Sequence, residues 1–284
     1  MSIAVEPHLT RTVPASSRPV HDALAALREG LPVLVMDAAE RKNEGYAVIA
    51  ADLATPRWIA WAVRHTSGLI CAPMRAERAE ELDLPLMVRK NENPRQTAFT
   101  VAVDAVDGVT TGISASDRAR TLRVLAASES RPADLTRPGH ILPLRARPGG
   151  VVERPGHTEA SVDLCSLAGL PPIAAVAALA GSGEELAPSM ASRHEVNDLA
   201  ARFDLPVLDI ADLVVHCLHH GSGLLPRVSR RSTTQLTTVY DDLTAVIFHD
   251  NQTGAEHIAL LGAIPIGPNW ADASDIHPRL LSRR

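Results

Sequence analysis

Apolar residues recur at helical and strand intervals along the first 218 residues. Val20, Leu24, Leu27 and Leu31 follow helical spacing, and Gly30 suits the end of that helix before a buried strand. The same pattern predicts helices, strands or both in five further stretches, residues 58–73, 97–105, 110–127, 161–179 and 192–218. Helices and strands that interleave in this way are typical of a layered α/β or α+β domain.

The pattern changes at both ends of this domain, which we assign to residues 19–218. Residues 1–18 are polar, rich in proline and serine and without a period, so we expect a disordered arm there. Residues 219–231 contain two glycines, a proline and several arginines, and we expect a linker. Residues 232–284 begin with alternating apolar positions around the turn sequence NQTG, which predicts a small β segment.

Composition narrows the possible partners. The chain is 45% hydrophobic and 21% charged with a net charge of −5, so it offers no basic face to nucleic acid or to an anionic membrane. Its longest apolar run, which begins at Ile173, is far shorter than the roughly 20 residues that cross a bilayer. Cys71, Cys165 and Cys217 are odd in number and widely spaced, which favours reduced thiols and a cytoplasmic location.

Two polar segments are candidates for chemistry. Residues 137–164 contain His140 and His157 among arginines, acids and glycines; arginine can bind phosphate through two hydrogen bonds, and neutral histidine can bind metal or transfer a proton. The alternative is a solvated loop with an N-capped helix after Thr158, and spacing leaves both interpretations open. Residues 110–118, TTGISASDR, place hydroxyl side chains at a helix N-terminus, which suits either an anion site or a simple cap.

Several segments together resemble 3,4-dihydroxy-2-butanone 4-phosphate synthase, an enzyme family of the riboflavin pathway. They occur in the family's order, and the most specific are TTGISASDR and GHTEASVDL, with GLPVLVMDAAERKNEG, SGLICAPM, TAFTVAVDA and DIADLV beside them. The resemblance implies an α+β fold of three layers around a mixed sheet, in a homodimer with sites near the interface. It also implies the conversion of ribulose 5-phosphate to dihydroxybutanone phosphate and formate with Mg²⁺.

The resemblance, carried over residue by residue, implies two groups of site residues. The expected catalytic residues are Lys42, Glu44, His140, His157 and Glu159, of which His157 is also the expected metal ligand. The expected substrate- and phosphate-binding residues are Arg41, Thr110, Thr111, Ser114, Asp117, Arg118, Arg154 and Thr158. The expected ligand is a phosphorylated small molecule.

Three positions depart from the family's pattern, and each lacks an acid. Lys42 replaces a metal-binding Glu, Tyr46 replaces the Asp that closes the acidic loop, and Ala178 replaces a catalytic Glu. An ammonium group removes a ligand and repels a cation, at a cost on the order of several kcal/mol at about 4 Å and an effective dielectric near 20. We therefore expect that Mg²⁺ binds weakly or not at all, and that ordinary synthase activity is severely reduced.

Lys42 allows two interpretations. In the first, chance replaced a glutamate by lysine, and the lysine has no chemical role. In the second, lysine was selected for its chemistry, because only two of the 28 basic residues are lysine. A lysine side chain can form an imine or stabilise an enediolate. The leading hypothesis is a divergent, lyase-like enzyme of specialised metabolism that acts on a pentulose phosphate by enolisation and dehydration. The alternatives are the ordinary synthase and a non-catalytic sugar-phosphate-binding or partner subunit.

The C-terminal segment from Ser232 resembles the opening strands of GTP cyclohydrolase II, the partner of this family in bifunctional fusions. No cysteine follows Cys217, so the thiolate ligands of that enzyme's zinc are missing from the segment. We therefore expect no zinc and no cyclohydrolase activity there.

Overall fold

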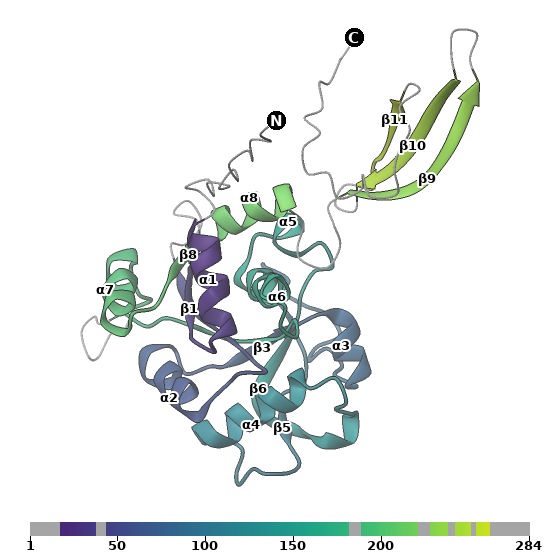
Figure 1. The fold of residues 1–284 in the computed structure, drawn as a ribbon. Coiled ribbons are helices and arrows are strands. Elements are labelled where there is room, and N and C mark those ends of the chain that lie inside the picture. The colour runs from purple at the N-terminus through teal and green to yellow at the C-terminus, as the bar shows by residue number, and fades with distance from the viewer. Residues whose placement is uncertain are drawn as a thin grey trace, which may run out of the picture. The chain divides into compact units, whose positions relative to one another are not determined.

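The structure is a computed structural model that describes residues 18–37, 44–181, 189–220, 228–237, 242–250 and 254–261. The chain forms two compact units, Met1–Arg227 and Val228–Arg284 (Figure 1). The boundary lies within the predicted linker, but helix α8 (Ile210–His220) and strand β9 (Val228–Thr237) extend into it from either side. The predicted arm lies outside the described residues, except for Arg18, which begins the first helix.

The first unit is built on a mixed sheet. Its strands are β1 (Val33–Met36), β2 (Gly45–Ala50), β3 (Cys71–Met74), β4 (Ala98–Phe99), β5 (Val103–Ala105), β6 (Leu135–Arg145), β7 (Ala174–Ala178) and β8 (Val207–Asp209). In the described residues their order is β4-β6-β3-β7-β2-β1-β8, with β5 paired to β6. The pairs β1–β8 and β3–β6 are parallel, whereas β1–β2 and β2–β7 are antiparallel.

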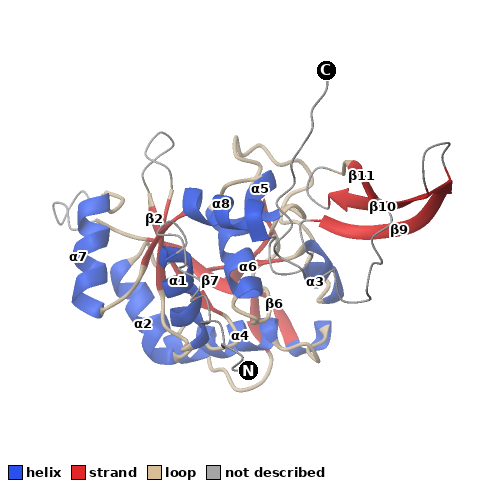
Figure 2. Ribbon diagram, turned by 45° about the horizontal axis from the view of Figure 1, so that its top comes forward, coloured by secondary structure: helices blue, strands red, loops and turns tan. Residues whose placement is uncertain are grey.

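Helices cover both faces of this sheet (Figure 2). On one face lie α1 (Arg18–Arg28), α5 (Gly150–Glu153), α6 (His157–Leu167) and α8. On the other lie α2 (Pro56–His65), α3 (Ala76–Glu81), α4 (Ala115–Ala126) and α7 (Arg193–Phe203), and a 3₁₀ turn, η2 (Pro132–Asp134), precedes β6. This arrangement confirms the predicted three-layer α+β fold.

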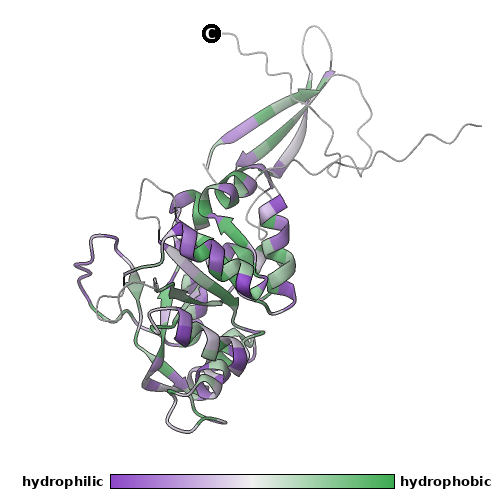
Figure 3. Cartoon of the chain, turned by 90° about the vertical axis from the view of Figure 1, so that its left-hand side faces the viewer, coloured by the Kyte–Doolittle hydropathy of each residue, from purple (hydrophilic) through white to green (hydrophobic). Residues whose placement is uncertain are grey.

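The two hydrophobic cores follow from the period of two along the strands. Met36 and Ile49 point into the core beneath α2 and α4, whereas Val35 and Val48 point into the core beneath α1 and α6. Because both faces are covered, the central strands are apolar on both sides. The helices carry hydrophilic and hydrophobic residues together, as covering helices require (Figure 3).

Local signals in the sequence account for several element ends. Gly30 has φ +73°, so it ends α1 in the left-handed conformation that glycine adopts without strain. Ser114 caps α4 by accepting a hydrogen bond from the Asp117 N–H at 3.1 Å. Thr55 caps α2 in the same way, with Trp58 N–H as donor at 3.3 Å.

Two predicted segments differ from the structure. Residues 97–105 form two short strands instead of one, because β4 and β5 pair with opposite ends of β6. The first third of residues 137–164, from 137 to 145, is not the solvated loop of one interpretation but most of β6. Gly139 is required in this strand because a Cβ would lie 2.0 Å from the carbonyl carbon of Val103. This glycine and the neighbouring prolines interrupt the alternation of apolar and polar residues by which a strand is predicted.

The second unit is an antiparallel sheet of β9, β10 (Asp242–Asp250) and β11 (Glu256–Leu261), in the order β11-β10-β9. Ala245 and Val246 are buried, whereas Ile258 and Leu260 are exposed. The NQTG turn falls outside the described residues except for Gly254. No helix among the described residues is long and apolar enough to span a membrane.

Candidate active site

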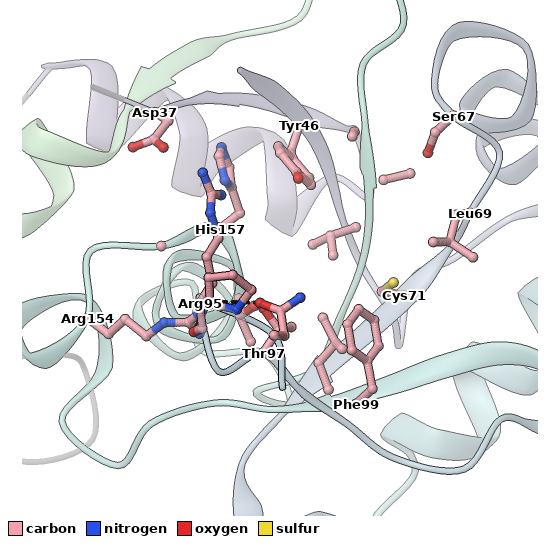
Figure 4. A pocket seen from close by; sticks show the side chains of 18 residues that line it. Asp37, Tyr46, Ser67, Leu69, Cys71, Arg95, Thr97, Phe99, Arg154 and His157 are labelled. Carbon is pink, nitrogen blue, oxygen red and sulfur yellow. Dashed lines mark hydrogen bonds between the residues drawn. The ribbon is translucent and has the colours of Figure 1, made fainter. Parts of the chain in front are cut away.

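A cavity of about 600 Å³ lies where strands β2, β3 and β7 meet the first turn of α6 (Figure 4). Its polar walls are formed by Asp37, Ser67, Asn93, Arg95, Thr97, Arg154, His157 and Thr158. Its apolar walls include Leu69, Cys71, Phe99, Leu144, Val176 and Ala178, and Tyr46 stands between the two kinds. The cavity therefore combines charged groups at one end with an apolar lining at the other.

His157 is the first residue of α6 and contacts Tyr46 of β2. The two rings are stacked, with centroids 3.8 Å apart and planes inclined by 28°. Nε2 of His157 is buried and has no hydrogen-bond partner among the described residues. Burial lowers the pKa of His157 to about 4, against the opposing charge of Asp37. The imidazole is therefore neutral near pH 7 and keeps a lone pair for a cation or a proton.

Arg154 is held in place by a buried acid. Its Nη1 lies 3.1 and 3.3 Å from the two carboxylate oxygens of Glu159, and its Nη2 donates to the carbonyl of Arg95 at 3.1 Å. Glu159 also accepts a hydrogen bond from the Arg147 N–H at 3.1 Å. Burial raises the pKa of Glu159, and Arg154 opposes that rise. Glu159 therefore joins Arg154 to the backbone of Arg147, and its expected catalytic role stays a prediction.

Arg95 also lines the cavity, although no motif in the sequence marks it as a site residue. Its N–H donates to Oδ1 of Asn93 at 2.8 Å, which fixes the loop. Burial is the main influence on the pKa values of His157 and Tyr46, and the positive charge of Arg95 lowers both. Its side chain stands on the cavity wall near His157 and Thr97 (Figure 4). Such a group on a cavity wall is suited to an anionic ligand.

A second cluster of expected site residues lies on the loop before α4 and in the first turn of α4, outside the walls of this cavity. Asp117 Oδ2 accepts hydrogen bonds from Thr110 Oγ1 at 2.8 Å and from the Gly112 N–H at 3.1 Å. The hydrogen bond from Thr110, with others from Ser114 and Gly112, lowers the pKa of Asp117 although burial acts in the opposite direction. The loop is therefore organised around an ionised carboxylate.

Asp104 joins this cluster to His140. Its Oδ2 lies 2.6 Å from Nδ1 of His140, and its Oδ1 accepts from the His140 N–H at 2.9 Å. A carboxylate at this distance fixes Nδ1 as the protonated nitrogen and leaves Nε2 as the proton acceptor. Gly112 has φ +88°, and a Cβ there would lie 2.0 Å from Asp104 Oδ2. The sequence pattern predicts Asp104 only as part of a strand within residues 97–105.

The remaining expected residues are scattered. Arg118 is buried, and its Nη1 donates to the Gly68 carbonyl at 3.2 Å, beside Ser67 of the cavity. Thr111 is exposed. Glu44 does not line the cavity, although its charge raises the pKa of Tyr46 after the larger effect of burial. Arg41 and Lys42 lie outside the described residues, so their roles stay predictions.

Comparison with known proteins gives the family of this site. A model of the 3,4-dihydroxy-2-butanone 4-phosphate synthase family matches residues 21–216. The 3,4-dihydroxy-2-butanone 4-phosphate synthase of Proteus mirabilis is 48% identical over 199 residues, which cover 70% of this chain and 90% of that protein. The riboflavin biosynthesis protein RibBA of Nocardia farcinica is 41% identical over 242 residues, which cover 85% of this chain but only 57% of that protein.

Solved structures give the same result. A 3,4-dihydroxy-2-butanone 4-phosphate synthase in complex with two magnesium ions is 44% identical with a TM-score of 0.68, over 72% of this chain and 99% of that one. RibBX from A. baumannii, a two-domain synthase, is 35% identical with a TM-score of 0.70, over 85% of this chain and 69% of that one.

The magnesium complex contradicts the expectation that this protein binds Mg²⁺ weakly or not at all. That expectation considered the repulsion from one ammonium group, Lys42, and the loss of one ligand. It did not count the carboxylate of Asp37, which lines the same cavity as His157. The positive charge of Lys42 therefore leaves Asp37 and His157 in the cavity as possible ligands of the cation.

Proposed function

Because the chain belongs to the 3,4-dihydroxy-2-butanone 4-phosphate synthase family, we propose that it is an ordinary synthase of riboflavin biosynthesis, which converts ribulose 5-phosphate to 3,4-dihydroxy-2-butanone 4-phosphate and formate. The observation that carries the proposal is the cavity at His157, which gathers a neutral imidazole, a carboxylate and two arginines. The identity of 48% to a relative of that name favours this function over the divergent enzyme that led the sequence interpretation.

We assign the phosphate end of the substrate to the arginine side of the cavity. Arg154 is held by Glu159 and faces the cavity beside Thr158, in the first turn of α6. A helix N-terminus offers free N–H groups and a favourable dipole to a phosphate. Arg95 adds a second guanidinium from the opposite loop. Two forked cations and a helix N-terminus match a dianionic phosphate monoester.

We propose a divalent cation, magnesium, as the cofactor, with His157 and Asp37 among its ligands. The fit rests on the buried Nε2 of His157, which lacks a partner in the described part of the chain, and on a carboxylate in the same cavity. No set of three metal-binding side chains occurs among the described residues, so we expect further donors from water or from residues 38–43, whose sequence contains Glu40. When bound, the cation supplies polarisation of the ketone oxygen.

We propose His140 as the group that transfers protons, oriented by Asp104, and a homodimer as the assembly that completes the site. The His140 cluster does not line the cavity of its own chain. Exposed apolar side chains occur at both places, with Leu69 54% exposed at the cavity and Ile113 52% exposed on the loop before α4. Leu86, Met87 and Val88 are also exposed. A second copy that covers these residues would shield them from water and join the two groups.

The test is incubation of the full chain with ¹³C-labelled ribulose 5-phosphate and Mg²⁺, followed by NMR. We expect formate and a four-carbon phosphate in equal amounts, loss of both with a chelator, and recovery when Mg²⁺ is restored. A five-carbon product without formate would contradict the proposal and favour the divergent lyase. Binding without turnover would instead favour the sugar-phosphate-binding subunit.

Lys42 stays a proposed catalytic residue on sequence grounds alone. Its ammonium group would stabilise negative charge on the reacting ketone. Lys42→Ala is therefore expected to lower kcat. The dissociation constant of the substrate should stay within about tenfold, which corresponds to about 1.4 kcal/mol of binding free energy. Lys42→Arg separates the two possible roles: recovery indicates charge alone, and continued loss indicates an imine. Full activity of Lys42→Ala would exclude any role.

A further inference from the structure

Tyr46 is placed by strand register, not by a loop. It lies directly opposite Ala178 of β7 and, on its other side, opposite Val35 of β1. Directly opposed residues in antiparallel strands project from the same face of the sheet, with Cβ atoms about 5 Å apart. The methyl group of Ala178 leaves space above β7 on the face from which the Tyr46 ring projects. Both residues line the cavity.

The contact between Tyr46 and His157 is closer and flatter than the other histidine ring contacts among the described residues of the first unit. Their centroids are 3.8 Å apart with planes at 28°. His65, by comparison, meets Phe203 edge to face, at 5.2 Å and 62°. Aromatic pairs usually lie about 4.5–7 Å apart. The stack therefore places an aromatic face flat against the His157 ring and restricts the rotation of that ring.

The stack also joins two elements that build the cavity. Tyr46 belongs to β2, and His157 begins α6, which packs on that side of the sheet. The His157 ring thus has an aromatic face on one side, and its Nε2 is buried. A side chain whose plane and burial are both fixed presents its lone pair in one direction only.

We propose that Tyr46 is a positioning residue for His157, and that Ala178 is the small cross-strand partner that makes room for the tyrosine ring. This inference rests on the proposed function, in which the orientation of His157 matters for turnover. Groups that orient a metal-binding histidine typically change affinity or activity by about 10- to 100-fold when removed. The phenol oxygen is not needed for this role, because the ring alone makes the stack.

The experiment compares Tyr46→Leu, Tyr46→Phe and Ala178→Leu in the full chain. The first removes the aromatic ring, the second keeps it, and the third keeps Tyr46 but fills the space that its ring needs. Histidine ring protons are followed by NMR without added metal, and the His157 signals are identified by their absence from His157→Gln. Turnover of ribulose 5-phosphate with Mg²⁺ is measured in parallel. Phe203→Leu is the matched control, since it removes an aromatic ring from His65 instead.

We expect the wild type and Tyr46→Phe to share upfield His157 signals, because a stacked ring shields those protons. Tyr46→Leu and Ala178→Leu should both lose that shift, and kcat should fall roughly 10- to 100-fold with little change in KM. Phe203→Leu should move only the His65 signals and keep wild-type turnover. Rescue of both readouts by phenylalanine supports positioning by the ring.

Unchanged His157 signals and kcat in Tyr46→Leu would overturn the inference and leave the proposed function intact. Loss of kcat in Tyr46→Phe equal to that in Tyr46→Leu would also overturn it, because the phenol oxygen would then be the active part. If the wild type shows the upfield signals but forms no formate, the proposed function fails, and with it the role of Tyr46 in turnover.

Discussion

The two clusters that contain the candidate site residues differ in what controls their charges. Around the cavity burial dominates, so that the pKa of His157 is lowered to about 4 and the pKa values of Tyr46 and Glu159 are raised. At the start of α4 hydrogen bonds dominate, and they lower the pKa of Asp117 although burial acts in the opposite direction. The first environment favours neutral groups, and the second favours an ionised one.

This difference separates two tasks within one proposed reaction. A neutral imidazole in a cavity offers a lone pair to a cation, and the two nearby guanidinium groups offer positive charge to phosphate. A histidine hydrogen-bonded to a carboxylate, as His140 is to Asp104, instead has a fixed tautomer for moving a proton. The side chain of His140 is 39% exposed, so its Nε2 is accessible to a ligand that is bound outside the cavity of the same chain.

The largest expected effect is that of removing the exposed histidine. His140→Asn should lower kcat by about 10²- to 10⁴-fold, the usual contribution of a general acid or base, with little change in substrate affinity. Steady-state kinetics with ribulose 5-phosphate measure this. The matched control is His194→Asn, because His194 also pairs with an aspartate, at 3.5 Å, but is 86% exposed on α7. Equal losses in both variants, or wild-type kcat in His140→Asn, would show that the two clusters do not divide the tasks in this way.

The next effect comes from the backbone that brings the second cluster together. Gly112→Ala places a Cβ 2.0 Å from Asp104 Oδ2 and 2.7 Å from His140 Nδ1, so the ion pair must move. A displacement of about 1 Å can cost on the order of 10²-fold in rate, and we expect kcat to fall by that order. Gly169→Ala is the control, since Gly169 also has a positive φ, +74°, but open space at its Cβ. Both variants share the backbone strain, so only the close contact should lower turnover; equal kcat values would contradict this.

A smaller effect is expected at the cavity from Arg95, which the sequence did not reveal. Arg95→Gln should raise KM roughly 10- to 100-fold, the value of one charged hydrogen bond of about 1.5–3 kcal/mol, with a smaller change in kcat. Calorimetric titration with ribulose 5-phosphate gives the same comparison without turnover. Arg89→Gln removes an exposed arginine from the same region and should behave as the wild type. If Arg95→Gln keeps the wild-type KM, phosphate binding belongs to Arg154 and α6 alone.

The sequence predicts some elements of the fold better than others. Helices such as α1 and α4 could be predicted because period, cap and C-terminal glycine agree, as at Ser114 and Gly30. β6 could not, because its Pro138 and Gly139 serve a close crossing with Val103 and hide the alternation of a strand.

The site residues show the same limit. His157, Arg154 and Thr158 were found because one short motif contains them. Asp104 and Arg95 reach their clusters through tertiary contacts between segments far apart in sequence, such as the 2.6 Å pair with His140. The stack of Tyr46 on His157 depends likewise on register between β2 and β7, which spacing along the chain does not encode.

The last expected effect concerns stability, without any effect on turnover, and it tests burial against hydrogen bonding directly. Asp163 of α6 accepts a hydrogen bond from the Val151 N–H at 2.8 Å, yet burial raises its pKa to about 6. An unfolded aspartate has a pKa near 3.9, so between about pH 4 and pH 6 the folded state binds more protons than the unfolded one. By linkage, this residue makes the free energy of unfolding fall as pH rises through that window, by at most about 3 kcal/mol.

Asp163→Asn should remove that slope while keeping an oxygen acceptor for Val151. The measurement is urea unfolding at several pH values from 4 to 7, with the difference between variant and wild type plotted against pH. Asp117→Asn is the opposite control: the lowered pKa of Asp117 gives stability that is present above pH 4 and is lost at lower pH, so this variant should lose stability in the upper range. Parallel curves for wild type and Asp163→Asn would mean that the hydrogen bond from Val151, and not burial, sets the charge of this carboxyl, and the contrast between the two clusters would not extend to α6.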